Sequence, residues 1–190
     1  TGAQWNGNDW HTYGWTAELT EHQKAILAAR YIHTTFVDAE ANAFLWWGLI
    51  YSLAPGSERD ANVQQKHRDE GLVLVCAPAD QVGDYQTFIE RTKKFYTFSQ
   101  YSQFIQPGYQ RIDIKPASGL HASAYVNEES TRLVVVVIND SAETKKLSFQ
   151  VDAGYHLVST HQTDKVRNCE EIADDVFFEP QSVRTVVYER

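Results

Sequence analysis

The run Asn42-Ala-Phe-Leu-Trp-Trp47 constrains the fold more than any other feature of the chain. It carries no charge and follows a segment with helical spacing of apolar residues. A short apolar run in this position predicts a strand buried on both faces, the order in which a β/α unit feeds a parallel sheet. Adjacent strand residues point to opposite faces, so we expect at least one of the two indoles to face a ligand at the strand's carboxyl end. The alternative is that both indoles fill the core.

The preceding segment is predicted to be a helix that ends near Asp38. Thr20 and Gln23 have the spacing of a capping box, which supplies partners to the first free backbone N–H groups. The apolar residues that follow recur at steps of three and four and must face a core: Ala25, Ile26, Ala29, Ile32 and Phe36.

The second half of the chain changes to an all-β pattern at Arg111. A helix over 95–105, stopped by Pro107-Gly108, precedes the change. We expect strands at 121–127, 131–139, 146–151, 155–160, 176–178 and 183–188. The wholly aliphatic run 133–138 predicts a central strand covered on both faces. The pattern therefore predicts an α/β unit over residues 1–110 and a small antiparallel β-sandwich over 111–190.

Composition narrows the classes of partner. The 190 residues carry a net charge of −8, which disfavours nucleic acid and anionic membranes, whose binding depends on clustered Lys and Arg. No apolar stretch reaches the length of a membrane span. Aromatic residues make up 13% of the chain, a content that suits carbohydrate binding. The chain has no Met at all, so Thr1 is interpreted as an internal position of a longer protein.

The sequence contains none of the motifs that are typical of a metal site, a nucleotide cofactor site or a serine-nucleophile catalytic triad. The sequence has no His-x-x-x-His or Cys-x-x-Cys spacing, no Gly-rich phosphate loop and no Gly-x-Ser-x-Gly. We therefore expect no metal and no cofactor. Cys76 and Cys169 fit either one disulfide that ties the two units together or two buried thiols.

Three pairs of carboxylates are candidates for an acid pair in hydrolysis. They are Glu18 with Glu21, Glu58 with Asp60, and Asp69 with Glu70. The first pair lies at a helix N-terminus, where acids favour the helix dipole, and the others lie in a mixed-charge loop expected to be solvated. All are interpreted as structural or surface charges, and no catalytic residue is assigned.

Taken in order, these motifs resemble glycoside hydrolase family 30. The resemblance rests on the double Trp at 46–47 and on Phe-Ser-Gln-Tyr-Ser-Gln-Phe-Ile-Gln-Pro-Gly at 98–108. It continues through His-Ala-Ser-Ala-Tyr at 121–125, Leu-Val-Val-Val-Val-Ile-Asn at 133–139 and Gln-Ser-Val-Arg-Thr-Val at 181–186.

The resemblance implies the C-terminal portion of a (β/α)8 TIM barrel, fused to a side antiparallel β-sandwich. It implies a secreted, extracellular retaining hydrolase whose two catalytic Glu residues lie before Thr1, so that this chain alone is inactive. The N-terminal remainder of the same enzyme would complete the barrel as its partner. Trp47 matches the family's subsite tryptophan; Trp46 beside it is also a candidate for substrate binding, although we expect it to pack inward. Trp5 and Tyr51, on loops at the same mouth, are candidates for neighbouring subsites, with plain loop packing as the alternative.

The substrate that the resemblance favours is the polysaccharide xylan. Glucuronoxylan-specific bacterial members carry a Tyr and a downstream Arg just after the Trp pair. Here residues 48–52 take that place, and no Arg occurs before Arg59. The long insertion at 53–94 resembles the fungal xylanase branch, with endo-β-1,4-xylanase or xylobiohydrolase action on glucuronoxylan. The alternatives are a β-1,6-glucanase, a glucosylceramidase-type member, and a non-catalytic carbohydrate-binding β-domain over 111–190.

Overall fold

The structure is a computed structural model that describes residues 19–52, 70–75, 89–116, 118–173 and 175–190. Within these ranges the chain is mostly β, with two helices, α1 (Glu21–Val37) and α3 (Lys93–Ser102). No helix in the described ranges is long and apolar enough to cross a membrane. Several predicted features lie outside them: Trp5, Cys76, and the carboxylates Glu18, Glu58, Asp60 and Asp69.

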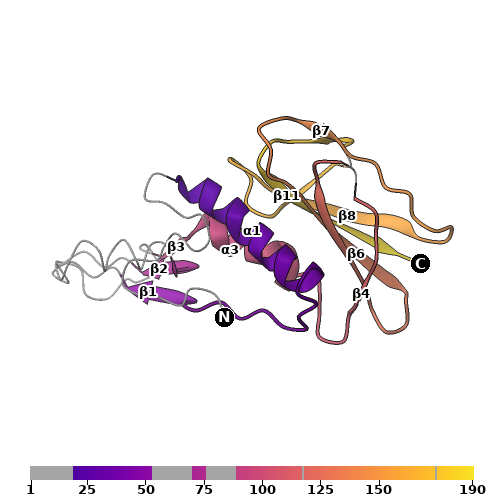
Figure 1. Ribbon diagram of the computed structural model, residues 1–190, viewed down its shortest axis with the longest axis horizontal. Helices are drawn as coiled ribbons and strands as arrows, with labels where there is room; N and C mark the ends of the chain where they lie inside the picture. The colour runs from indigo at the N-terminus through magenta and orange to yellow at the C-terminus, as the bar shows by residue number, and fades with distance from the viewer. Residues whose placement is uncertain (1–18, 53–69, 76–88, 117, 174) are drawn as a thin grey trace.

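The largest element is a six-stranded antiparallel sheet (Figure 1). Its strand order is β4-β5-β6-β11-β8-β9. The strands are β4 (Gln110–Ile112), β5 (His121–Val126), β6 (Arg132–Asn139), β8 (His156–Thr163), β9 (Glu170–Ile172) and β11 (Ser182–Glu189). The prediction of a central strand at 133–138 is confirmed, because β6 pairs with β5 on one side and β11 on the other.

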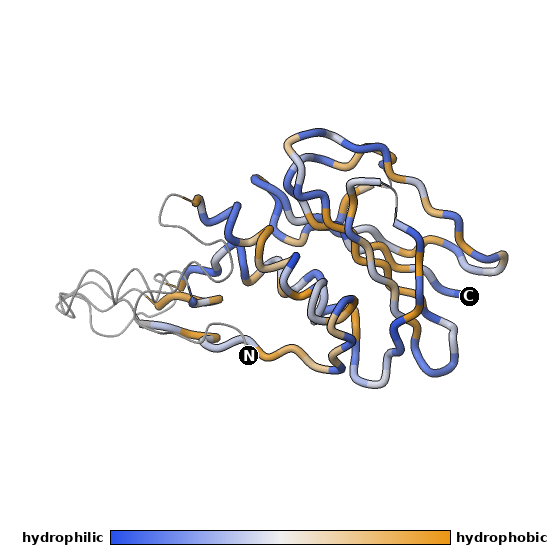
Figure 2. The backbone as a smooth tube through the Cα atoms, in the orientation of Figure 1, coloured by the Kyte–Doolittle hydropathy of each residue, from blue (hydrophilic) through white to orange (hydrophobic). Residues whose placement is uncertain are grey.

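Both faces of β6 are covered, as the aliphatic run predicts. Val134, Val136 and Ile138 share one hydrophobic core with both helices, while Leu133, Val135 and Val137 belong to a second core on the opposite face. Figure 2 shows hydrophobic stretches in the central strands, with hydrophilic loops around them. The alternation follows from the two-residue period of a strand.

Helix α1 begins at the predicted capping box. The Gln23 backbone N–H donates to Thr20 Oγ1 at 3.2 Å, and the Thr20 backbone N–H donates to Gln23 Oε1 at 2.9 Å. The helix ends at Val37 with Asp38 as its C-cap, also as predicted. Its apolar stripe packs on the sheet beside α3, whose Gln100 carbonyl accepts from Thr185 Oγ1 of β11 at 2.7 Å.

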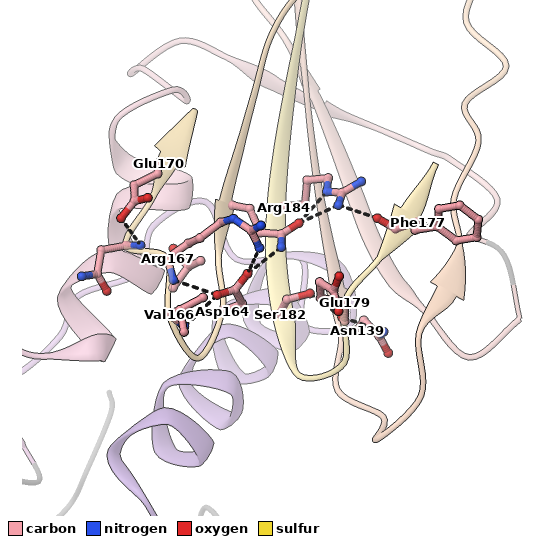
Figure 3. A network of polar contacts seen from close by, with 12 residues as sticks. Asn139, Asp164, Val166, Arg167, Glu170, Phe177, Glu179, Ser182 and Arg184 are labelled. Carbon is pink, nitrogen blue, oxygen red and sulfur yellow. Dashed lines mark hydrogen bonds and ion pairs between the residues drawn. The ribbon is translucent and has the colours of Figure 1, made fainter. Parts of the chain in front are cut away.

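The turn between β8 and β9 is held by the carboxylate of Asp164 (Figure 3). Asp164 accepts hydrogen bonds from the backbone N–H groups of Val166 and Arg167 at 2.8 and 2.7 Å. It also accepts from Gln162 Nε2 at 2.7 Å and from Arg167 Nη1 at 2.6 Å. Lys93, at the start of α3, donates to the Asp164 and Arg167 carbonyls, both at 2.9 Å. The turn is thereby joined to the helix layer.

Arg184 of β11 is buried and extends the same network to the outer face of the sheet. Its guanidinium donates twice to Gln162 Oε1, at 2.9 and 2.6 Å. It also donates to the carbonyls of Asp175 and Phe177, and it lies over the Phe178 ring at 4.9 Å from the centroid. A buried guanidinium is tolerated because its donors are satisfied in this way.

Two predicted strands are corrected by the structure. Residues 42–47 form no strand, because no described strand lies beside them to complete their backbone hydrogen bonds. Of the run 146–151, only β7 (Lys145–Lys146) forms a ladder, with β10 (Phe177–Phe178). Leu147, Phe149 and Val151 still pack against the sheet, so their period-two pattern predicts the direction of the side chains and not the pairing.

A separate three-stranded sheet lies beside the helices (Figure 1). It consists of β1 (Ile50–Ser52), β2 (Val73–Val75) and β3 (Ile89–Arg91). The pair β1–β2 is parallel and the pair β2–β3 is antiparallel. One parallel pair does not make a barrel, so the barrel portion over 1–110 stays a prediction, as does the boundary near residue 110.

Candidate functional site

The two tryptophans differ in burial as predicted. Trp47 is 73% exposed, whereas Trp46 is partly buried. Trp46 Nε1 donates to the Glu70 carbonyl at 2.6 Å, and the indole meets the Phe98 ring edge-on at a centroid distance of 5.3 Å. The Phe44 ring stacks on the Trp46 indole at a centroid distance of 6.4 Å. Trp46 therefore anchors the segment to α3 and leaves Trp47 facing outward.

Gly48 allows the chain to turn directly after Trp47. Its φ is +100°, a value that side-chain-bearing residues rarely adopt, and a Cβ there would lie 2.1 Å from Cε2 of Tyr51. The Tyr51 ring thus packs on the glycine backbone. The next residues enter β1, whose pairing with β2 begins where the Leu72 N–H donates to the Gly48 carbonyl at 3.3 Å.

The Tyr51 hydroxyl donates to Glu70 Oε2 at 2.9 Å. Burial of the phenol raises its pKa to about 12, and the hydrogen bond to Glu70 and the charge of that carboxylate act in the same direction. A hydrogen bond with the Trp47 side chain acts in the opposite direction. Tyr51 is therefore a neutral donor to the Glu70 carboxylate, and it is itself hydrogen-bonded to the side chain of Trp47.

Glu70 corrects the expectation of a solvated charge. It is only 2% exposed, and it joins Trp46 through its carbonyl and Tyr51 through its carboxylate. Sequence reasoning missed this role because the residue lies in a charged run, and no periodicity marked it as buried. The parallel pairing of β1 and β2 brings it within hydrogen-bond distance of Trp46 and Tyr51.

Glu21 has a structural role that fits its interpretation as a helix N-terminal acid. Its carboxylate lies 2.7 Å from Nζ of Lys94, a residue with no exposed surface, and 3.8 Å from Nζ of Lys24. A buried lysine needs such a partner. Among the described carboxylates that are candidates for catalysis, Glu21 and Glu70 are therefore each bound to a group in the fold.

Cys169 is a free thiol, so the disulfide alternative is not formed at this residue. Burial raises its pKa to about 11, which keeps the thiol protonated and unreactive. The described residues include no cluster of three or more potential metal ligands among His, Cys, Asp and Glu.

The tyrosines of the β half do not form a row for sugar stacking. Tyr125 and Tyr188 are buried. Tyr155 is partly buried, and its hydroxyl donates to the Ser130 carbonyl at 2.5 Å. These three tyrosines therefore give a carbohydrate-binding module over 111–190 no stacking platform.

Large apolar side chains are exposed in succession around the tryptophan pair. Leu45 is 82% exposed, and Trp47, Leu49 and Ile50 are also exposed. We call residues 45–50 the exposed apolar segment. Such a concentration is typical of an interaction surface or a ligand-binding groove.

Comparison with curated proteins gives a xylan-degrading relative. No protein-family model matches the sequence. The chain is similar to the glucuronoxylanase XynC of Bacillus subtilis, with 24% identity over 133 residues. The alignment covers 69% of this chain and 24% of the relative, so the chain spans about a quarter of the curated relative's length.

Two solved structures share the fold. The glycoside hydrolase family 30 subfamily 8 xylanase Xyn30A of Clostridium acetobutylicum matches 91% of this chain, with a TM-score of 0.66 and 22% identity over 40% of its own length. The family 30 endoxylanase of Clostridium papyrosolvens matches 87%, with a TM-score of 0.60 and 22% identity over 38% of its length. All three relatives are bacterial, so closeness to the fungal branch stays a prediction. The resemblance that the sequence predicts is confirmed, and the chain is related to the xylanase-type members of glycoside hydrolase family 30.

Proposed function

We propose that this chain is the C-terminal part of a secreted retaining glycoside hydrolase that acts on xylan. Both catalytic Glu residues would lie in the preceding part of the same protein. That part would also cover Leu45, Leu49 and Ile50, which are exposed among the described residues, and would leave the Trp47 indole open to the substrate. The names of the relatives, which are xylanases, favour xylan over a β-1,6-glucan or a glucosylceramide.

The observation that carries the proposal is that the Trp47 indole is exposed while its chain neighbours are held in place. A sugar ring binds well to a flat aromatic face, which offers apolar contact area at little conformational cost. These neighbours, Trp46, Gly48 and Tyr51, are held through their contacts with each other and with Glu70. In this arrangement Trp47 forms one wall of a sugar subsite.

Tyr51 has a secondary role in the proposal. Its hydroxyl is committed to Glu70, so we assign it the positioning of Trp47 rather than a direct sugar contact. Trp46 is assigned a packing role, because its indole N–H is already committed to the Glu70 carbonyl. Trp5 lies outside the described residues and remains a candidate for a neighbouring subsite.

The test is Trp47→Ala in the complete protein, with xylan as substrate. We expect kcat/KM to fall at least about tenfold, equivalent to about 1.4 kcal/mol of transition-state binding. The melting temperature should stay unchanged, because the side chain is mostly exposed. Initial rates of reducing-end release give the kinetic parameters.

Trp46→Ala is the matched control. Removing this partly buried indole should lower stability by about 3 kcal/mol, through lost packing and the lost hydrogen bond to Glu70. Full activity of Trp47→Ala together with a lowered melting temperature would reverse the two assignments and remove the substrate role from Trp47.

A further inference from the structure

Two histidines meet where helix α1 packs on strand β5. The rings of His33 and His121 lie 5.6 Å apart between centroids, edge to face. Further along both elements, Phe36 meets Tyr125 in the same way at 6.3 Å. Residues 33 and 36 share a face of the helix, and residues 121 and 125 share a face of the strand, so both ring pairs belong to one contact. The imidazole pair is the part of this contact that can change its charge near neutral pH.

His121 has a carboxylate beside it. Its Nε2 lies 3.3 Å from Oδ2 of Asp140, directly after β6, and Nη1 of Arg30 on α1 donates to the same oxygen at 2.8 Å. All three side chains also reach solvent. An opposite charge at this distance favours the charged form of an imidazole. A proton on His121 is therefore compensated, although Asp140 is shared with Arg30.

His33 has no such compensation. It is 8% exposed, and its Nδ1 is buried with no hydrogen-bond partner among the described residues. Burial lowers its pKa, and His121 of β5 lowers it further; Arg30 of α1 and Arg111 of β4 act in the same direction, while Asp38 at the C-cap of α1 opposes them. A proton on His33 would thus be a buried charge that faces three cationic groups and one carboxylate.

We propose that the His33–His121 pair is a pH-sensitive switch in the packing of α1 on β5. The helix stays packed while His33 is neutral, and it loosens from the strand when His33 takes up a proton beside a charged His121. Two imidazolium rings at this distance repel each other, and His33 regains water only if the helix moves away. Because the folded pKa of His33 lies below the ordinary value of 6.5, the packing is most stable above pH 6.5 and weakens as the pH falls below it.

The experiment measures hydrogen–deuterium exchange of the complete protein by mass spectrometry between pH 7.5 and pH 5, with exchange times scaled for the intrinsic pH dependence of amide exchange. Peptides over residues 29–38 report on α1, and peptides over 132–139 of the central strand β6 are the internal reference. We expect protection of the α1 peptides to fall at least about threefold from pH 7.5 to pH 5, while protection of the β6 peptides stays constant.

Glutamine variants identify the group that takes up the proton. His33→Gln should abolish the fall in α1 protection, because no buried imidazole remains. His121→Gln should reduce the fall, because the repulsion is removed while the burial of His33 remains; its amide can still donate to Asp140. His156→Gln is the matched control, since His156 lies exposed at the start of β8, and it should keep the full fall of the parent.

Three results would overturn the proposal. The first is equal protection of the α1 peptides at both pH values, which needs no variant. The second is a fall in His33→Gln or His121→Gln as large as in the parent, which would assign the effect to other groups or to His33 alone. The third is an equal fall in the β6 peptides, which would mean loosening of the whole domain. All of these readouts are independent of xylan hydrolysis, so they leave the proposed function untouched.

Discussion

Gly48 controls the position of the Tyr51 ring, and through it the contacts that Tyr51 makes with Glu70 and Trp47. The glycine has φ of +100° and leaves no room for a side chain against the Tyr51 ring. The ring in turn holds its hydroxyl 2.9 Å from Glu70 Oε2. A single methyl group at position 48 would therefore act on two contacts at once, the backbone turn and the buried hydrogen bond.

We expect Gly48→Ala to destabilise the protein by about 2–4 kcal/mol, combining backbone strain with displacement of the Tyr51 ring. Gly154→Ala is the matched control, because Gly154 has a similar φ of +110° but no atom within 4 Å of the position that a Cβ would occupy. It should lose only the strain component. Urea unfolding of both variants measures the difference. Equal losses would mean that the Tyr51 ring yields freely and does not fix the site.

The different exposure of the two tryptophans could be predicted from the sequence, but the position of Glu70 could not. Alternation along an extended chain separates Trp46 from Trp47, whatever strand they join. Glu70 meets Trp46 and Tyr51 across 24 and 19 residues, through pairing of β1 with β2. Local spacing contains no information on such a contact.

At the scale of elements, the β8–β9 turn depends on one ionised carboxylate. Burial alone raises the pKa of Asp164, but hydrogen bonds from Arg167, Gln162 and Val166 outweigh it and lower the pKa to about 2, below the ordinary value of 3.8. The side chain is only 6% exposed. Because the folded pKa lies below the unfolded one, the stabilisation is complete above pH 4 and is lost as the pH falls toward 2.

We expect Asp164→Asn to lower the free energy of unfolding by about 2 kcal/mol at pH 6, and to flatten the stability profile between pH 4 and 2. Denaturant unfolding across this range gives the profile. Glu143→Gln is the control: its carboxylate is also paired, with Lys145 at 2.9 Å, but it is exposed and should change little. A parent-like acid profile in Asp164→Asn would show that other carboxylates govern acid unfolding.

Elements whose sequence signal lies within the element itself could be predicted, whereas elements that depend on a distant partner could not. The α1 capping box and the aliphatic run of β6 act on their own neighbours, so their bounds follow from the sequence. Residues 42–47 have the composition of a buried strand and still form none within the described residues, because a strand exists only where a second strand pairs with it. The periodicity of apolar residues predicts which face of a segment is apolar, but it does not predict which strand pairs with that segment.

At the scale of the whole molecule, the described residues contain two hydrophobic cores, one on each face of the six-stranded sheet, and one edge that is not covered. The helices and the six-stranded sheet bury their apolar residues against each other. The exposed apolar segment and the small β1–β2–β3 sheet have no comparable layer over them in the described part of the chain. The chain also matches only 40% and 38% of the two family 30 xylanase structures. Under the proposed function, substrate binding on Trp47 and bond cleavage would depend on different parts of the complete protein.

The last prediction follows from this division: the purified 190-residue chain should release no sugar from xylan, whereas the complete protein should. Retaining hydrolysis needs two carboxyl groups about 5 Å apart, one free to attack carbon and one to protonate the leaving oxygen. In the described part, Glu21 is paired with Lys94 and Glu70 is buried against Tyr51, so neither is available for this chemistry. Reducing-end release by chain and complete protein, prepared in the same way, makes the comparison. Turnover by the chain that disappears in a Glu70→Gln variant would place a catalytic carboxylate within these residues and refute the proposed division.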